Sequence, residues 1–241
     1  MILFLRSLAF NLAFFCFTTI ASCFAALFAL LGGFKGALFI ARWWGFGTMA
    51  LLRIIVGLRY EIKGEEHLKS LDHPVIIACK HQSTWETAIA PALFNNISII
   101  LKRELTWIPI FGWALSAAKP ITLDRGKGRQ VIPGMLARAQ QRIAEGLDIF
   151  IFPEGTRARF GAEPHYKNGI VALYEHLNRP VLPIAHNAGY FWPRRGFIKR
   201  PGVIQLTFLP PIPQGLSGAD FKTKLVDVIE TACQQMGPHH G

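Results

Sequence analysis

The feature that most constrains this chain is a run of 28 residues, positions 7–34, that contains no charged side chain. A helix needs about 20 apolar residues to cross a bilayer, so this segment is long enough to do so. A signal-peptide core has only about 7 to 15 residues, and we therefore expect the segment to be retained. Ile20-Ala21-Ser22-Cys23 resembles a lipoprotein cleavage site, but positions 24–31 stay apolar where a cleaved lipoprotein would continue with a polar tether.

A second apolar stretch, positions 36–58, carries residues that favour the headgroup level of a membrane, namely Arg42, Trp43, Trp44 and Arg53. Two arrangements stay open: a spanning helix followed by an interfacial one, or a helical hairpin within one leaflet. The first 60 residues hold five basic side chains and no acidic one. If the first helix spans the membrane, this distribution places the rest of the chain on the cytoplasmic face of the inner membrane. We predict one or two membrane-associated helices in residues 1–59 and a separate domain in residues 60–241.

Composition narrows the class of protein. Hydrophobic residues make up 51% of the chain and charged residues only 17%, which excludes disorder, collagen and coiled coil. The formal net charge of +11 is compatible with nucleic-acid binding, but contact with acidic lipids explains the charge together with the aromatic residues. We therefore expect membrane lipids and no nucleic acid as partners. The four cysteines form no C-x-x-C motif and are widely spaced, which predicts reduced thiols in the cytoplasm.

After position 60 the pattern changes to short apolar runs that alternate with amphipathic stretches. Alternation of this kind predicts an α/β domain with a largely parallel sheet flanked by helices. The expected strands are 74–79, 97–101, 121–123, 148–152, 181–185 and 203–209. The expected helices are 84–94, 109–117, 129–145, 168–178 and 218–235.

The loop after the first of these strands contains a candidate general base. His81 and Glu86 would lie about 140° apart on one helix, too far round for contact, so they meet only if His81 precedes the helix. Ser83 and Glu86 have the spacing of a capping box, which begins the helix between the two residues. Two interpretations remain: Glu86 caps the helix by bonding the Ser83 backbone, or it orients His81 as a base.

Three further strand ends carry groups that suit an anion. Lys102 and Arg103 follow the strand at 97–101, and Arg125 follows the strand at 121–123. After the strand at 148–152, Gly155 allows a sharp turn of the backbone. The hydroxyl of Thr156 and the guanidinium of Arg157 can hold a phosphate. The alternative for each is a solvated basic surface. Because the carboxyl ends of parallel strands share one edge of the sheet, the four loops together favour one site.

Several motifs, taken in order, resemble the glycerolipid acyltransferases, and most closely the bacterial lysophosphatidic acid acyltransferases. These are His81-x4-Glu86, Lys102-Arg103-Glu104-Leu105 to Ile108-Pro109-x-x-Gly112, Leu123-Asp124-Arg125, Phe152-Pro153-Glu154-Gly155-Thr156-Arg157 and Val181-Leu182-Pro183-Ile184. The resemblance covers roughly residues 60–210, and several spaced blocks in order are more specific than any single one.

The resemblance implies transfer of an acyl group from acyl-CoA or acyl carrier protein to the sn-2 hydroxyl of lysophosphatidic acid, giving phosphatidic acid. It assigns His81 as the base and Glu86 as the acid that orients it, although the family usually has Asp at this position. The phosphate-binding set is expected to be Lys102, Arg103, Arg125, Glu154, Gly155, Thr156 and Arg157. No metal or bound cofactor is expected.

The same chemistry follows from the residues alone. His81 would take the proton of the acceptor hydroxyl as it attacks the thioester, then return it to the departing thiolate. A serine hydrolase is disfavoured because no G-x-S-x-G motif is present. Cys79 as a thiol nucleophile is an alternative, but a buried strand cysteine is usually inert.

Other hypotheses stay open at this stage. The acceptor could be lyso-ornithine lipid or glycerol 3-phosphate, or the chain could be a non-catalytic protein that binds acidic lipids. A basic cluster beside Phe191-Trp192, formed by Arg194-Arg195 and Lys199-Arg200, is either a second membrane or carrier-protein contact or an ordinary basic loop. The two histidines at the end of the chain, His239 and His240, are a weak metal motif.

Overall fold

A computed structural model describes residues 1–237, without the side chains of 30–32, 125, 127 and 129. Within this part of the chain a seven-stranded sheet has the order β1-β7-β6-β2-β5-β3-β4. The strands are β1 (Leu58–Lys63), β2 (Ile76–Cys79), β3 (Ile97–Lys102), β4 (Ile121–Leu123), β5 (Asp148–Ile151), β6 (Val181–His186) and β7 (Gly202–Phe208). The six strands expected from the sequence are thus confirmed. The first strand in the chain, β1, was not predicted.

The sheet is mostly parallel, as expected. Strands β2 to β6 run in one direction, so the carboxyl ends of β2, β5, β3 and β4 lie at one edge, which we call the carboxyl edge. Strands β1 and β7 are parallel to each other, and β7 is antiparallel to β6. The four loops that carry the candidate site residues, those after β2, β3, β4 and β5, were predicted to share one edge. This prediction is confirmed. The strand β1 begins at Leu58, so the sheet starts two residues before position 60. The division into 1–59 and 60–241 stays a prediction.

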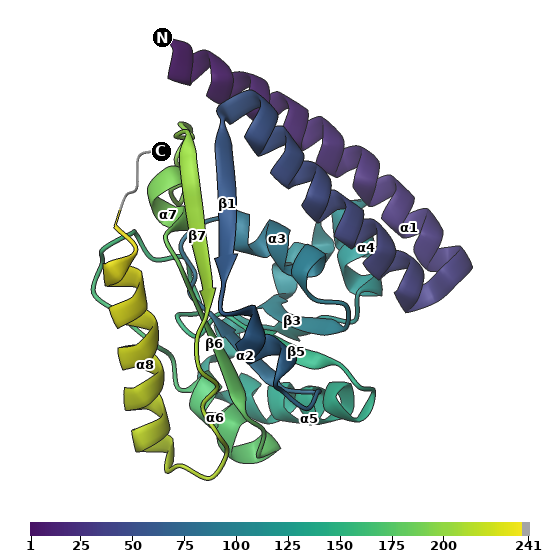
Figure 1. The fold of residues 1–241 in the computed structure, drawn as a ribbon. Coiled ribbons are helices and arrows are strands. Elements are labelled where there is room, and N and C mark those ends of the chain that lie inside the picture. The colour runs from purple at the N-terminus through teal and green to yellow at the C-terminus, as the bar shows by residue number, and fades with distance from the viewer. Residues whose placement is uncertain (238–241) are drawn as a thin grey trace.

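Helices cover both faces of the sheet (Figure 1). They are α1 (Ile2–Leu51), α2 (Glu65–Lys69), α3 (Trp85–Leu93), α4 (Phe111–Ala117), α5 (Val131–Ala144), α6 (Gly169–Leu177), α7 (Ala188–Phe191) and α8 (Gly218–Gln235). Shorter turns are η1 (Leu52–Val56), η2 (Arg103–Trp107) and η3 (Arg125–Gln130). All five predicted helices are present, with ends within about two residues of those expected, the ordinary uncertainty of helix boundaries.

Alternate residues of the central strands supply two apolar layers. In β2, Ile77 and Cys79 belong to the layer that includes α1 and α3, whereas Ile76 and Ala78 belong to the layer that includes α5, α6 and α8. All four side chains are buried, as expected for a parallel strand with helices on both faces. The loops at the carboxyl edge are therefore carried by strands that are packed on both faces.

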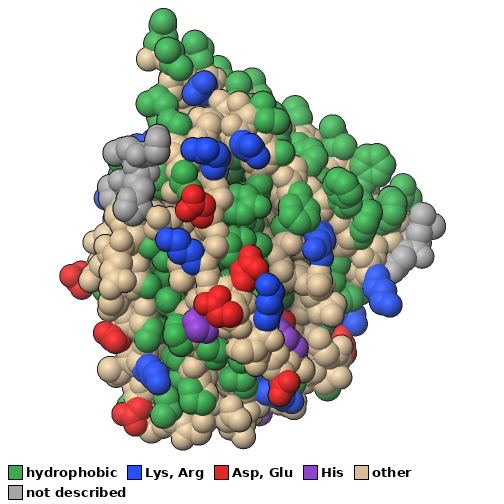
Figure 2. Space-filling view, in the orientation of Figure 1, with side chains coloured by type: hydrophobic (Ala, Val, Ile, Leu, Met, Phe, Trp, Pro, Cys, Tyr) green, Lys and Arg blue, Asp and Glu red, His purple; other side chains and the backbone are tan. Residues whose placement is uncertain are grey.

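The charge-free run forms the first arm of a helical hairpin. Gly33 has a non-helical backbone (φ 57°, ψ −142°) that divides α1 into two arms, a conformation that glycine adopts without steric cost. The indole of Trp44 donates to the Thr18 hydroxyl of the other arm at 3.0 Å. Two segments, Ile2–Ala29 and Gly33–Val56, are long and apolar enough to cross a membrane. Figure 2 shows apolar side chains gathered over the hairpin, and its exposed members include Leu12, Phe15, Phe24, Phe39 and Trp43.

The hairpin lies along the flank of the sheet domain and packs against α3 and α4 (Figure 1). Lys199 anchors its first arm, because its backbone N–H donates to Ser7 Oγ at 2.9 Å and its Nζ donates to Asn11 Oδ1 at 2.6 Å. Burial lowers the pKa of Lys199 to about 8. Lys199 is enclosed between the hairpin and the sheet, so it is available neither for a membrane or carrier-protein contact nor as part of an exposed basic loop. For the rest of the basic cluster, Arg194, Arg195 and Arg200, both interpretations stay open.

Candidate active site

The loop after β2 brings His81 and Glu86 into contact. His81 Nδ1 lies 2.8 Å from Glu86 Oε1, and His81 precedes α3, as the sequence required. The same oxygen accepts the backbone N–H groups of Gln82 at 2.8 Å and Ser83 at 2.7 Å. Glu86 thus makes the capping contact and the imidazole contact together, so the two interpretations from the sequence are compatible. Because an ionised carboxylate only accepts hydrogen bonds, Nδ1 carries the hydrogen and Nε2 has a free lone pair.

Glu86 is fully buried and keeps its charge. Burial alone would raise the pKa of this carboxyl, but the two neighbouring imidazoles and the backbone donors hold the pKa of Glu86 below its usual range. Its second oxygen, Oε2, accepts no hydrogen bond from the described residues and lies 3.8 Å from His186 Nε2. His186 donates from Nε2 to the Lys80 carbonyl and accepts the Ala188 N–H at Nδ1. Burial lowers the pKa of His186, an effect that the negative charge of Glu86 opposes.

Glu154 supports His81 from the backbone side. Its Oε2 accepts the His81 N–H at 2.6 Å, and its Oε1 lies 2.9 Å from Lys80 Nζ. Burial raises the pKa of Glu154, an effect that Lys80 opposes. The contacts of this carboxylate are therefore with a backbone amide and an ammonium group inside the protein. The assignment of Glu154 to the phosphate-binding set stays a prediction.

The imidazole of His81 borders a cavity of about 520 Å³. One face of the ring stacks on Phe152, with centroids 3.9 Å apart and planes 18° apart. The cavity is also lined by Gly155, Thr156 and Lys167. Gly155 has a positive φ of 66°, which confirms the sharp turn expected at this position. A hydroxyl group in this cavity would lie among the His81 imidazole, the turn at Gly155 and Thr156, and the Lys167 side chain.

The predicted cations with described side chains lie on the carboxyl edge, where Lys102 and Arg103 are exposed and Arg157 is half-buried. Arg157 Nη1 donates to Thr84 Oγ1 at 2.7 Å, at the start of the helix that carries Glu86. Lys102 is exposed at the end of β3, and Arg103 lies 3.6 Å from Asp124 in a pair open to solvent. The side chain of Arg125 lies outside the described part of the chain. The binding assignments of Lys102, Arg103, Arg125, Thr156 and Arg157 stay predictions.

Two alternatives to general-base chemistry are a cysteine nucleophile and a metal site. Cys79 is buried, and its burial together with nearby Glu86 raises the pKa of the thiol well above its usual value, which opposes nucleophilic catalysis. Among the described residues no group of three or more His, Cys, Asp and Glu side chains is placed to hold a metal ion. His239 and His240 lie outside those residues.

Three residues around the site were not predicted from the sequence. His186 stands at the carboxyl end of β6, so the rule used for the other strand ends applies to it as well. Lys80 is next to His81, but nothing in the sequence distinguishes its buried side chain from a surface lysine. Lys167 lies in the long connection between β5 and α6, where no periodic pattern predicts its position at the cavity.

Fold and site together define an α/β protein that holds a His–carboxylate pair at the carboxyl edge of a mostly parallel sheet. Residues 59–187, more than half of the chain, match the Acyltransferase family model, and the protein belongs to the acyltransferase family. This confirms the resemblance found in the motifs.

Similar proteins support the family assignment. The chain is 40% identical over 172 residues to a 1-acyl-sn-glycerol-3-phosphate acyltransferase of Pseudomonas aeruginosa, a match that covers 71% of this chain and 66% of that protein. It is 29% identical over 174 residues to human 1-acyl-sn-glycerol-3-phosphate acyltransferase alpha, covering 70% and 60%. The matched part thus spans no more than about two thirds of these relatives. The crystal structure of the Thermotoga maritima enzyme PlsC has the same fold (TM-score 0.79, 20% identity, 98% and 99% covered).

Proposed function

We propose that this protein transfers an acyl group from acyl-CoA or acyl carrier protein to the sn-2 hydroxyl of 1-acylglycerol 3-phosphate, giving phosphatidic acid. The observation that carries the proposal is the His81–Glu86 pair beside a cavity on the edge that also holds the exposed cations. The names of the Pseudomonas and human relatives support the same reaction.

His81 acts as general base in this proposal. Its Nε2 takes the proton of the sn-2 hydroxyl while that oxygen attacks the thioester carbonyl and forms the new ester bond. When the carbon–sulfur bond breaks, the proton returns from Nε2 to the thiolate, so the free thiol leaves and His81 is neutral again. Glu86 keeps the hydrogen on Nδ1 and stabilises the transient imidazolium. No acyl-enzyme is required, because the thiolate is a good leaving group.

The acceptor phosphate is bound by cations of the carboxyl edge. Arg157 is the best placed of them, since its contact with Thr84 uses one of five N–H donors and fixes the guanidinium at the first turn of α3. Lys102, Arg103, Arg125 and Thr156 complete the predicted set. We add Lys167 to this phosphate-binding set because it lines the cavity.

The hairpin holds this edge at the membrane surface. Its exposed aromatic and aliphatic side chains suit lipid, and its basic residues suit acidic headgroups. Both the acceptor and the product are lipids, so an enzyme attached to the bilayer meets them where they reside. In this account the protein belongs to the inner membrane, with the sheet domain on the cytoplasmic face.

The test is acyl transfer by the purified protein in liposomes, with three acceptors and two donors. Lysophosphatidic acid, lyso-ornithine lipid and glycerol 3-phosphate are each offered with acyl-CoA or acyl carrier protein, and the products are identified by mass spectrometry. We expect phosphatidic acid as the main product. Product from another acceptor alone would overturn the proposed substrate. No product from folded protein that still binds acidic liposomes would favour a lipid-binding protein instead.

A further inference from the structure

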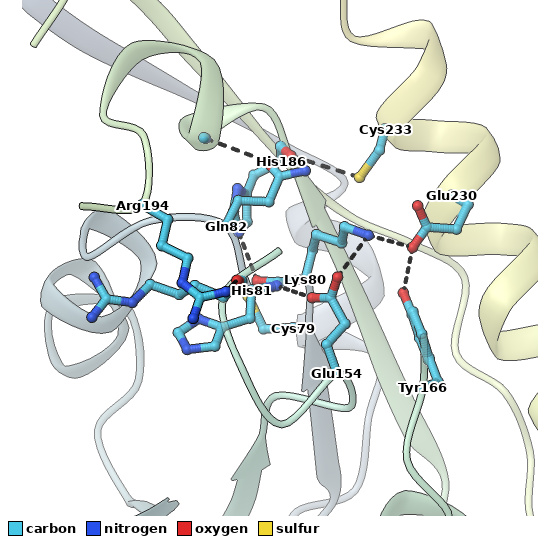
Figure 3. A network of polar contacts seen from close by, with 12 residues as sticks. Cys79, Lys80, His81, Gln82, Glu154, Tyr166, His186, Arg194, Glu230 and Cys233 are labelled. Carbon is cyan, nitrogen blue, oxygen red and sulfur yellow. Dashed lines mark hydrogen bonds and ion pairs between the residues drawn. The ribbon is translucent and has the colours of Figure 1, made fainter. Parts of the chain in front are cut away.

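A cluster of buried charges lies behind the backbone of His81 (Figure 3). Lys80 Nζ is 2.9 Å from Glu154 Oε1 and 2.6 Å from Glu230 Oε1, and the Tyr166 hydroxyl donates to the same Glu230 oxygen at 2.8 Å. The side chains of Lys80 and Glu154 are 2% and 3% exposed. Charges buried to this degree depend on their partners, because an unpaired one is costly to remove from water.

The cluster connects the last helix to the base. Glu230 lies in α8, outside the family-matched residues 59–187. From there the contacts run through Lys80 to one oxygen of Glu154, and the other oxygen of Glu154 accepts the His81 N–H at 2.6 Å. A hydrogen bond from a backbone N–H to an ionised carboxylate is stronger than one to a neutral carboxyl group. The charge on Glu154 therefore determines how firmly His81 is held.

We propose that Lys80 and Glu230 are positioning residues for acyl transfer: Glu230 holds the charged Lys80 in place, Lys80 keeps Glu154 ionised, and Glu154 in turn fixes the backbone of His81 so that Glu86 can orient the imidazole. The inference rests on the proposed function for its kinetic consequence. Its structural consequence, a firmly held His81 amide, stands without it.

The electrostatics of the cluster agree with this arrangement. Burial raises the pKa of Glu154, the negative charge of Glu230 adds to that effect, and Lys80 opposes both. Burial would lower the pKa of Lys80, but the two carboxylates outweigh it and keep the amine charged. Without Lys80 the two carboxylates would face each other, and Glu154 would take up a proton. Its hydrogen bond to His81 would then weaken.

The kinetic test compares K80M, E230Q and the double variant K80M/E230Q. We expect K80M to lower kcat by about 100-fold with little change in KM, as for a misplaced catalytic group. E230Q leaves Lys80 paired with Glu154 and should change kcat much less. The double variant removes the repulsion between the carboxylates, so its kcat should be about tenfold higher than that of K80M. This would be a non-additive result. The control is K69M, which breaks the exposed Lys69–Glu65 pair on α2 and should keep wild-type kcat.

A second measurement does not depend on activity. Hydrogen–deuterium exchange of the peptide that covers residues 79–84 reports the hold on the His81 amide. We expect faster exchange of this peptide in K80M and partial recovery of its protection in K80M/E230Q. In K69M its exchange should match the wild type. Peptides from β3 and β5 should keep their protection in all three variants. An inactive wild-type protein would contradict the proposed function but would leave this exchange pattern intact.

The inference would be overturned if folded K80M kept wild-type kcat and wild-type exchange at 79–84. It would also be overturned if K80M exchanged faster in every strand, since this is loss of stability and not of local position. An additive double variant, with no recovery from E230Q, would likewise contradict the proposed link through Glu154.

Discussion

Among the described residues, His81 and His73 each place Nδ1 2.8 Å from a carboxylate oxygen, at opposite ends of the central strands. His81 Nδ1 lies 2.8 Å from Glu86 Oε1, and His73 Nδ1 lies 2.8 Å from Asp148 Oδ1. The first pair follows β2 at the carboxyl edge. The second precedes β2 and lies at the start of β5, so it is at the amino ends of the same strands.

The surroundings of the two pairs differ. His81 borders a large cavity. Its partner Glu86 accepts hydrogen bonds from three N–H groups, and the pKa of this carboxyl is lowered. The side chain of His73 is 41% exposed, against 15% for His81, and burial raises the pKa of Asp148, whose other partner is the Val75 N–H. The comparison teaches that the contact alone does not identify a catalytic pair. What distinguishes the first pair is a carboxylate with a lowered pKa, a cavity and nearby cations.

The largest contrast should come from neutralising each carboxylate. We expect E86Q to lower kcat by about 10³-fold, because the imidazole loses the group that fixes its tautomer and stabilises its charged form. D148N should keep kcat and lower stability by about 1 kcal/mol, through the weakened bonds to His73 and Val75. Initial rates and urea unfolding check both, and equal losses of kcat would erase the distinction between the pairs.

Removing a cation tests another of these differences, the cations near the first pair, which we propose to bind the acceptor phosphate. R157A should raise KM for lysophosphatidic acid about tenfold, the cost of one charged hydrogen bond, and leave KM for the acyl donor unchanged. An equal rise for both substrates would count against phosphate recognition by Arg157.

Stability should depend on pH in opposite directions at the two pairs. Glu86 has a pKa lowered from 4.5, so its stabilisation is present above that value and is lost as the pH falls below it. Asp148 has a pKa raised from 3.8, so its contribution is largest at low pH and declines as the pH rises above that value. The stability difference between wild type and E86Q should therefore grow with pH, and that between wild type and D148N should shrink. Unfolding in detergent between about pH 3.5 and 5.5 measures both slopes, and slopes of the same sign would contradict the assignment.

The smallest effect is expected at the buried thiol next to the first pair. C79A should leave kcat unchanged and cost about 1 kcal/mol of stability, because Cys79 fills space in the core and, among the described residues, its thiol donates only to the Lys80 carbonyl. A large loss of activity in stable C79A protein would restore the thiol nucleophile as a hypothesis.

Much of this arrangement was predictable because its causes are local in the sequence. Apolar runs gave the central strands, and the Ser83–Glu86 spacing placed His81 before the helix, so the contact with Glu86 followed. The strand β1 escaped prediction because its half-buried pattern alternates apolar residues with charged ones, Arg59, Glu61 and Lys63, directly after a long apolar stretch. An exposed edge strand of this kind has no continuous apolar run to reveal it.

The contacts behind the backbone of His81 could not be predicted. Lys80 and Glu230 are 150 positions apart, and only the packing of α8 on the sheet brings them together. The pairing of His73 with Asp148 also depends on the strand order, which places β5 beside β2. Long-range contacts between charged residues leave no periodic pattern in a single sequence. For the same reason the sequence did not reveal that Lys199 is buried beneath the hairpin.

The most direct test of the comparison replaces each histidine in turn. H81A and H73A are prepared in the same liposomes, shown to be folded, and assayed for phosphatidic acid formation from lysophosphatidic acid. The account predicts that H81A loses activity by about 10³-fold or more while H73A keeps the wild-type rate. Retained activity in H81A, or an equal loss in H73A, would contradict the claim that the surroundings make the first pair the catalytic one.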